Sequence, residues 1–521
     1  MSGFLLFNNV PFPTPIEVIN QDDTNLQVES RENTTVNVIS PYSTSAFGEN
    51  IVTQLSPVIQ LQFPYSVSTS NTIQFYNGTG ALTSSNSQLV LSTGSTILSD
   101  AAIASRDFLT YQPGVGALAR FTAGFDTGSN SVSTFQQIGL GTQEDGFFFS
   151  YTNNDINILI RKGGLRTQYS LKITGPATSG GDITLTLNGS VQTIPVTLSD
   201  VNTNATEIGT FDFPFYNNSS NGNTVNIIAE RTGPQTGTFS FSPGTTGMTA
   251  TLTLEVTGVT ETTNTINRKK WNNDVCDGSD FMPAIDWSKG NVYQIRYQWL
   301  GYGVVSFYIE NPNNGYISLV HQYKYPNTNI TPSIYNPSMQ FLANVANALT
   351  TKNVSMFICS VGCFVEGSYP STSNLFGNNV SNFYTNTVGN TTKENVVTFR
   401  SPPHFQGVST RAVVYILRLI VTVSTAANIE ISRNSVLTDD TKWTSLGANV
   451  LLESSDDAAD VSGGEIIYTE RGEKQDRFVI DPLKWQIAIA KIYPGDILTI
   501  SGKADTGTSV IGVSVNWLEP L

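Results

Sequence analysis

The sequence predicts an all-β protein built from tandem β-sandwiches, and three observations lead to this fold class. Charged residues make up only 13% of the 521 residues, about half of the usual ~25%. Thr, Ser, Asn and Gly are abundant instead, and β-branched residues favour strands over helices. Apolar residues recur at every second position in many short runs, whereas long stretches with helical periodicity are nearly absent. A chain of this length is too long to fold around a single hydrophobic core, so we expect two to four domains.

The clearest predicted sheet lies within residues 287–326. Side chains alternate between the two faces of a strand, and over 293–299 every second residue is Tyr, Ile or Trp, with Gln and Arg between them. A glycine-rich break follows, and then a second apolar strand at 305–309. Pro, Asn and Gly make 311–315 a strong turn, and a third strand returns over 316–321. An antiparallel meander with one aromatic face is typical of one half of a sandwich.

Residues 1–50 are predicted to form an extended arm. Pro11, Pro13 and Pro15 alternate with other residues, and proline at this density excludes a helix. The start of the arm is rich in Phe, Leu and Val, which are unfavourable in water. The arm therefore either folds back on its own domain or inserts into a neighbouring subunit, and the sequence leaves both alternatives open. It has no basic segment before its short apolar run, so we expect no signal peptide.

Apolar segments that we interpret as strands continue from residue 51 to residue 164, with turns such as Asn-Gly-Thr-Gly at 77–80. The strings ARFTAGF, QQIGLG, DGFFFSY and INILIRKGG follow one another up to residue 164. The string VYQIRYQWLGYGVVSFYIENPNNGYISLVHQYKYP comes much later, at 292–326.

These strings, in this order, resemble a concanavalin-A/laminin-G-like sandwich, in which a glycine-bounded strand, an aromatic strand and a hairpin follow one another. More closely, they are similar to segments of structural proteins of tailed phages and of large DNA viruses of algae and protists. Similar strings recur there in capsid-associated fibre or spike proteins. The resemblance covers roughly residues 100–164 and 270–370, and its motifs pack aromatic residues and glycines rather than carry catalysis.

The part between these two stretches differs in character and predicts a separate small domain. Thr alternates with Ile, Leu or Val in several short runs there, and we interpret the segment as an insertion into a surface loop of the sandwich. Residues 373–392 are rich in Asn, Thr and Gly and are expected to form a linker. Beyond this linker the sequence predicts seven or so strands, and strands at this spacing favour a jelly-roll-like sandwich. The predicted domains are the arm (1–50), a discontinuous lectin-like sandwich (51–164 plus 261–385), the inserted domain (165–260) and a C-terminal sandwich (386–521).

Charge and apolar runs argue against two classes of partner. The net charge is −14, from 27 basic and 41 acidic residues, and Arg268-Lys269-Lys270 is the only basic run that stands out. Nucleic-acid binding needs a concentrated basic surface, so we do not expect it. The longest apolar run, 413–423, contains Arg418 and is far shorter than the ~20 residues of a membrane span. We therefore expect no membrane insertion.

The cysteines and histidines predict neither a disulfide framework nor a cofactor. Cys276, Cys359 and Cys363 are too few for a disulfide scaffold. Cys359 and Cys363 would lie ~13 Å apart in an extended strand, which is too far for a bridge unless the glycine between them bends the chain. We expect free thiols. With only His321 and His404 available, a Cys/His zinc site is not expected either.

Catalysis is not predicted. A glycosidase needs two carboxylates that face each other across a groove, but the predicted inner strands carry almost none. Glu310 ends its strand alone, and Glu144-Asp145 lies in a turn. The acidic runs at 439–440 and 456–460 lack EF-hand spacing and are interpreted as solvated loops.

Glycan binding would need exposed aromatic side chains, because the C–H faces of sugars stack on aromatic rings. Most aromatic residues in the predicted strands are assigned to the core. The exposed candidates are Tyr302, which is flanked by glycines, and the turn residue Tyr316.

The main functional hypothesis is therefore a structural protein of a virus particle: a capsid-associated fibre, spike or penton-type appendage at the virion surface that contacts host glycans. Its expected partners are copies of itself, as a trimer, and other capsid proteins. The alternative is a stand-alone carbohydrate-binding module of lectin type. An enzyme that degrades surface polysaccharide is the more distant third hypothesis.

Overall fold

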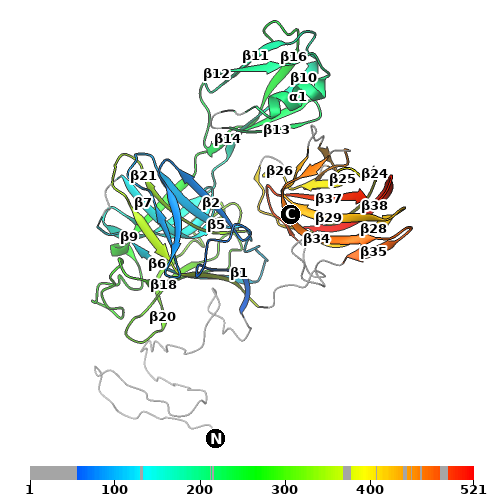
Figure 1. Cartoon of the computed structure of the whole chain (residues 1–521). Helices are drawn as coiled ribbons and strands as arrows, with labels where there is room; N and C mark the ends of the chain where they lie inside the picture. The colour runs from blue at the N-terminus through cyan, green and yellow to red at the C-terminus, as the bar shows by residue number, and fades with distance from the viewer. Residues whose placement is uncertain are drawn as a thin grey trace, which may run out of the picture.

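The computed structural model describes residues 55–128, 133–211, 213, 216–367, 377–405, 408–437, 443–447, 449–457, 460–480 and 491–520. The predicted arm (1–50) and a strand predicted near 485–489 lie outside these residues. Antiparallel sheets make up nearly all of the described structure (Figure 1). The predicted fold class, tandem β-sandwiches, is confirmed. In the described part of the chain no helix is both long and apolar enough to cross a membrane.

The first sandwich consists of two sheets that share one core. One sheet has the order β20-β19-β18-β6-β22-β4-β3, and β23 pairs with β6 and with β1. Its strands are β1 (Leu55–Gln62), β3 (Ala81–Ser85), β4 (Gln88–Ser92), β6 (Gly116–Phe125), β18 (Asn291–Tyr297), β19 (Val305–Glu310), β20 (Ile317–Tyr323), β22 (Ser355–Ile358) and β23 (Ser360–Glu366). The other has the order β17-β9-β8-β7-β21-β5-β2. Its strands are β2 (Thr72–Asn77), β5 (Asp100–Ser105), β7 (Thr134–Gly141), β8 (Gly146–Thr152), β9 (Asp155–Lys162), β17 (Thr262–Asn267) and β21 (Phe341–Asn347).

Aromatic rings from both sheets meet in the core between them. Phe149 lies 4.9 Å from Tyr293 and 5.5 Å from Phe307, measured between ring centroids. The predicted aromatic face of the meander is thus buried. Trp299, which the pattern assigns to the same face, lies beyond the end of β18 and is only partly buried. The chain turns away there, because Leu300 adopts a positive φ of 41°.

The segment predicted as an insertion leaves the sandwich between two paired strands. Lys162 at the end of β9 pairs with Thr262 at the start of β17, and Leu165 forms a further bridge to Val259. The residues between them have a core of their own. They form β10 (Arg166–Gly175), β11 (Gly181–Leu187), β12 (Ser190–Val196), β13 (Tyr216–Asn221), β14 (Thr224–Thr232), β15 (Ser240–Ser242), β16 (Thr249–Val256) and the helix α1 (Val201–Gly209). Asp200 caps this helix by accepting hydrogen bonds from the backbone of Asn202 and Thr203.

The described part of the C-terminal unit contains a five-stranded sheet, a six-stranded sheet and two short two-stranded sheets around a separate core. Its elements are β24 (Asn378–Val388), β25 (Glu394–Arg400), β26 (His404–Phe405), β27 (Val408–Ser409), β28 (Val414–Val423), β29 (Ala427–Arg433), β30 (Val436–Leu437), β31 (Thr444–Ser445), β32 (Glu453–Ser455), β33 (Val461–Ser462), β34 (Glu465–Gly472), β35 (Arg477–Ile480), β36 (Lys491–Ile492), β37 (Ile497–Ala504) and β38 (Ser509–Glu519). A short 3-10 helix η1 (Arg268–Lys270) follows β17 in the first sandwich.

The predicted linker at 373–392 needs correction. Strand β24 lies inside it and pairs with β38 along its whole length, from Asn378 to Val388. The C-terminal unit therefore begins before residue 386. The polar composition concealed this strand, because β24 lies at the sheet edge and most of its side chains face water.

The pairing of β9 with β17 predicts that the inserted domain can be removed. Excising residues 166–258 leaves Leu165 and Val259, which already lie side by side as a bridge pair, so a short Gly-Ser turn can join them. Loop-closure entropy changes only slowly with loop length, and we expect the shortened protein to keep its folded sandwich. Near-ultraviolet circular dichroism shows whether the shortened protein is folded, and urea unfolding measures its free energy of unfolding. In the shortened protein, Phe149→Ala should lower the free energy of unfolding by about 3–5 kcal/mol, because it removes a buried aromatic ring from the core. Unfolding of the excised protein, with a fragment 1–164 that folds alone, would contradict the discontinuous architecture.

Candidate functional site

Tyr302 and Tyr316, the glycan-binding candidates from the sequence, lie near the β18-β19-β20 meander. Tyr302 is 38% exposed, its hydroxyl donates to the carbonyl of Ile330 at 2.8 Å, and its ring stacks on Tyr325. Tyr316 is 72% exposed, in the turn between β19 and β20. Neither residue lines the cavities described below. Their role in glycan binding stays a prediction.

The second candidate site is a groove on the outer face of the seven-stranded sheet, with a volume of about 850 Å³. Its floor comes from neighbouring strands of this sheet, and its walls come from the C-terminal unit, from the beginning and end of the inserted domain, and from the turn between β7 and β8. The floor residues include Phe75, Ala102, Phe135, Gln137, Arg161, Leu342 and Asn344. We call this cavity the sheet groove.

The floor of the sheet groove combines apolar and amide side chains. Phe135 packs against an outer-face cluster that includes the buried Phe148 and Leu342. The guanidinium of Arg161 lies over the Phe148 ring at 5.2 Å and donates to the side-chain oxygen of Gln137 at 3.0 Å. Such a surface offers apolar contact and fixed hydrogen-bonding groups side by side, which suits a ligand with both polar and apolar faces.

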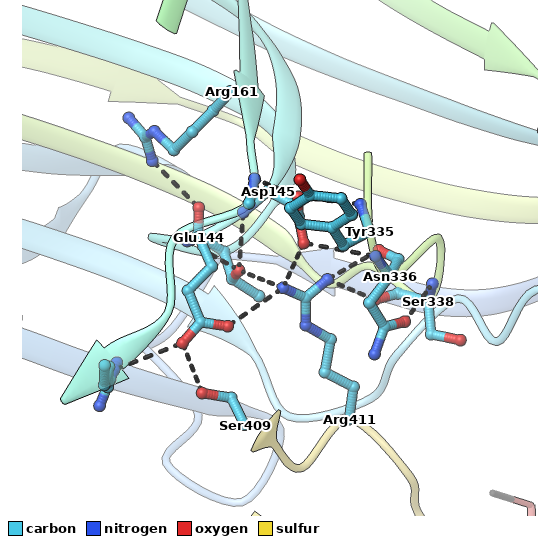
Figure 2. Close-up of polar contacts among 11 residues, drawn as sticks. Glu144, Asp145, Arg161, Tyr335, Asn336, Ser338, Ser409 and Arg411 are labelled. Atoms are coloured by element: carbon cyan, nitrogen blue, oxygen red, sulfur yellow. Dashed lines mark hydrogen bonds and ion pairs between the residues drawn. The ribbon is translucent and has the colours of Figure 1, made fainter. Parts of the chain in front are cut away.

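Arg411 forms the wall where the C-terminal unit meets the sandwich (Figure 2). Its side chain is almost completely buried and donates to Asp145 at 3.0 Å, to Glu144 at 3.3 Å and to the hydroxyl of Thr142 at 3.0 Å. The same guanidinium donates to the carbonyl of Asn336 at 2.7 Å. These contacts join the loop before β28 to the turn between β7 and β8. The two carboxylates that the sequence assigned to a turn are therefore buried at a domain junction.

Further contacts hold the same junction. Glu144 also accepts a hydrogen bond from Ser409 and lies 3.3 Å from Nε of Arg166, the first residue of the inserted domain. Arg106 pairs with Asp496 at 2.7 Å. Next to these polar contacts Phe108 of the sandwich packs into a buried cluster with four residues of the C-terminal unit, namely Val413, Tyr415, Tyr493 and Leu518.

Several groups around the groove are buried without a hydrogen-bond partner among the described residues. Both ring nitrogens of His404 are in this state, and burial, together with the nearby charge of Arg166, lowers the pKa of His404 to about 4. The other residues of this kind in the groove lining are Asn344, Thr410 and Arg411, each through one side-chain atom. Unpaired buried polar atoms are rare in folded proteins and require an explanation such as a ligand or a water.

The described lining of the groove lacks the carboxylate arrangement that glycoside hydrolysis requires. Glu144 and Asp145 are both engaged by Arg411, so they are not a pair of carboxylates facing an open space as glycoside hydrolysis requires. The described residues contain no group of His, Cys, Asp and Glu side chains that could hold a metal ion. Charges in the lining are balanced: Arg161, Arg166 and Arg411 against Asp100, Glu144 and Glu261.

Sequence reasoning missed this site, although one signal was present. The runs at 147–149 and 156–160 are apolar at almost every position, and a strand of this kind is buried on both faces. The outward residues Phe148 and Leu159 are indeed buried. Arg411 and His404 gave no comparable signal, because their importance arises from contacts between segments far apart in the chain.

No family model matches the chain, and no curated protein matches it. Among solved structures, the carbohydrate recognition domain of Emp47p is similar with 10% identity and a TM-score of 0.25, over 60% of this chain and 93% of that chain. Peanut lectin with a nine-residue peptide has 10% identity and a TM-score of 0.26, over 61% and 100%. The binding domain of botulinum neurotoxin serotype G has 9% identity and a TM-score of 0.25, over 69% and 59%. Likeness at these scores supports no conclusion about function.

Replacing Arg411 tests the domain junction. Arg411→Met removes the cation, so that Asp145 loses its buried counter-ion and Glu144 keeps only Arg166, and breaking such a buried pair costs about 3–5 kcal/mol. The matched control is Arg471→Met, because Arg471 pairs with Asp505 at 2.8 Å but is 60% exposed; such pairs contribute only about 0–1 kcal/mol. Urea unfolding followed by tryptophan fluorescence compares the two. Equal effects would show that the Arg411 network does not hold the junction.

The two histidines predict a specific pH dependence of stability. The pKa of each is lowered to about 4, for His321 by burial and then by Lys324, whereas in the unfolded chain it is near 6.5. Between these values the unfolded state binds more protons, so the free energy of unfolding falls as the pH falls from about 6.5 to about 4. His404→Gln should reduce this slope, and His321→Gln should remove the other part. An unchanged slope in His404→Gln, measured by urea unfolding at a series of pH values, would contradict the assignment.

Proposed function

We propose that this protein binds carbohydrate, without catalysing a reaction on it, and that the ligand lies in the sheet groove. The observation that carries this proposal is the set of buried polar atoms without a described hydrogen-bond partner in the groove lining, at Asn344, His404, Thr410 and Arg411. Leaving such a group unpaired costs about 1–3 kcal/mol. A ligand rich in hydroxyl groups can pair with donors and acceptors at several of these positions at once.

The floor supports the same ligand class. Phe75 and Phe135 offer ring surfaces for the C–H faces of a sugar, and the amides of Gln137 and Asn344 can exchange hydrogen bonds with hydroxyl groups. The amide oxygen of Asn344 has no protein donor among the described residues. The balanced charge of the lining favours a neutral sugar over an anionic one.

A role at the surface of a virus particle is the second candidate function, and the resemblance of residues 100–164 and 270–370 to capsid-associated proteins favours it. In this setting the sheet groove would contact host glycans, and copies of the chain would assemble as a trimer beside other capsid proteins. Sedimentation at micromolar concentration is the direct measurement of self-association. A stable monomer would favour the stand-alone carbohydrate-binding module instead.

Glycan binding is tested by isothermal titration of the full chain with chito-, malto- and manno-oligosaccharides. For a series that binds, Phe75→Ala and Asn344→Ala should each weaken affinity by about tenfold or more, equivalent to ~1.4 kcal/mol. The matched control is Phe383→Ala, because Phe383 is exposed like Phe75 but lies on β24 of the C-terminal unit. Tyr316→Ala tests the site predicted from the sequence. Loss of binding with Tyr316→Ala, and full binding with Phe75→Ala and Asn344→Ala, would move the site from the sheet groove to the meander.

A further inference from the structure

A second cavity, of about 760 Å³, lies between the inserted domain and the C-terminal unit. The inserted domain contributes residues of β10, β13 and β14 together with the residues after α1. The C-terminal unit contributes residues 400–404 and residues near Glu453 and Ile497. We call this cavity the domain cleft.

The domain cleft adjoins the sheet groove. Arg166, Pro403 and His404 line both cavities, so the two cavities are neighbours that share these three side chains. Arg166 begins the inserted domain, and His404 begins the short strand β26 of the C-terminal unit. His404 is the residue whose two ring nitrogens are both buried without a described partner. A ligand that passes from one cavity to the other therefore passes a residue that still has hydrogen bonds to make.

The lining of the domain cleft has the same chemistry as the groove. It contains the amides of Asn218 and Asn226 and the aromatic Tyr169. Its charges are again balanced, with Arg166 and Arg400 against Glu255 and Glu453. Arg400 pairs with Glu453 and lies over the ring of Trp443 at 4.4 Å, so its charge is already neutralised. Nothing in this lining favours an anion over a neutral polyhydroxylated chain.

A ligand that occupies both cavities must be larger than one that occupies either cavity alone. Each volume alone lies in the range of about 300–1,000 Å³ that is typical of a single small-molecule site. We propose that the sheet groove and the domain cleft form one continuous binding path, and that the ligand is a linear oligosaccharide long enough to cross the junction at His404. This inference rests on the proposed function and deepens it: the protein recognises an internal stretch of a polysaccharide chain rather than a single terminal sugar.

The inserted domain and the C-terminal unit then act as parts of the site. The sandwich supplies the floor of the sheet groove and one of its walls, whereas the domain cleft exists only where the two other units approach each other. Asn226 is the most useful residue for a test. It lies on β14, is half-buried, and faces the cleft without contributing to the core of the inserted domain.

The experiment compares disaccharides with hexasaccharides of the chito, malto and manno series by isothermal titration of the full chain. In the series that binds, the hexasaccharide should bind about tenfold or more tightly than the disaccharide. Asn226→Leu should abolish this gain and leave the affinity for the disaccharide unchanged. Phe75→Ala, in the sheet groove, should weaken both ligands. Near-ultraviolet circular dichroism confirms that each variant is folded.

Two results would overturn the inference and keep the proposed function: equal affinities for the two lengths, or a hexasaccharide affinity that Phe75→Ala lowers and Asn226→Leu does not. A folded wild-type chain that binds no member of the three series at millimolar concentration would overturn both. The failure of the continuous path and the failure of carbohydrate binding are therefore distinguishable.

Discussion

The burial of the Arg411 guanidinium between Glu144 and Asp145 is the interaction on which the arrangement of the three units depends. A guanidinium always carries its charge and presents several donors in a fixed plane, so it can engage two carboxylates and a backbone carbonyl at once. Glu144 extends the same network to Ser409 of the C-terminal unit and to Arg166 of the inserted domain. One turn of the sandwich thus contacts both other units. The walls of the sheet groove are built from this turn and from its partners.

The point of insertion explains why the inserted domain contributes to the walls of the sheet groove. The inserted domain leaves and re-enters through paired strands at the edge of the seven-stranded sheet, and its two connections are tied by the bridge between Leu165 and Val259. Its first residue, Arg166, therefore lies close to the groove floor.

The sequence was sufficient to predict the fold class, because alternation over 293–299 and the apolar runs at 147–149 and 156–160 depend only on near neighbours in the chain. It was insufficient for β24, whose polar, exposed side chains look like a linker until β38 is placed beside it. It also could not predict the groove. Glu144 and Asp145 lie in a turn, as predicted, and are nevertheless buried, because Arg411, which is 266 positions from Asp145 in the chain, covers them. Contacts between such distant segments leave no local periodicity.

The distribution of unsatisfied groups adds a last argument about where function lies. A hydrophobic core accepts few unpaired polar atoms, because each is destabilising. Stability alone would favour an apolar side chain in place of His404, whose pKa lies far below its ordinary value as a result of burial. The chain instead has a histidine where the groove and the cleft meet, and further unpaired atoms on the surrounding walls. In the groove lining, a bound hydroxyl-rich ligand would offset this cost.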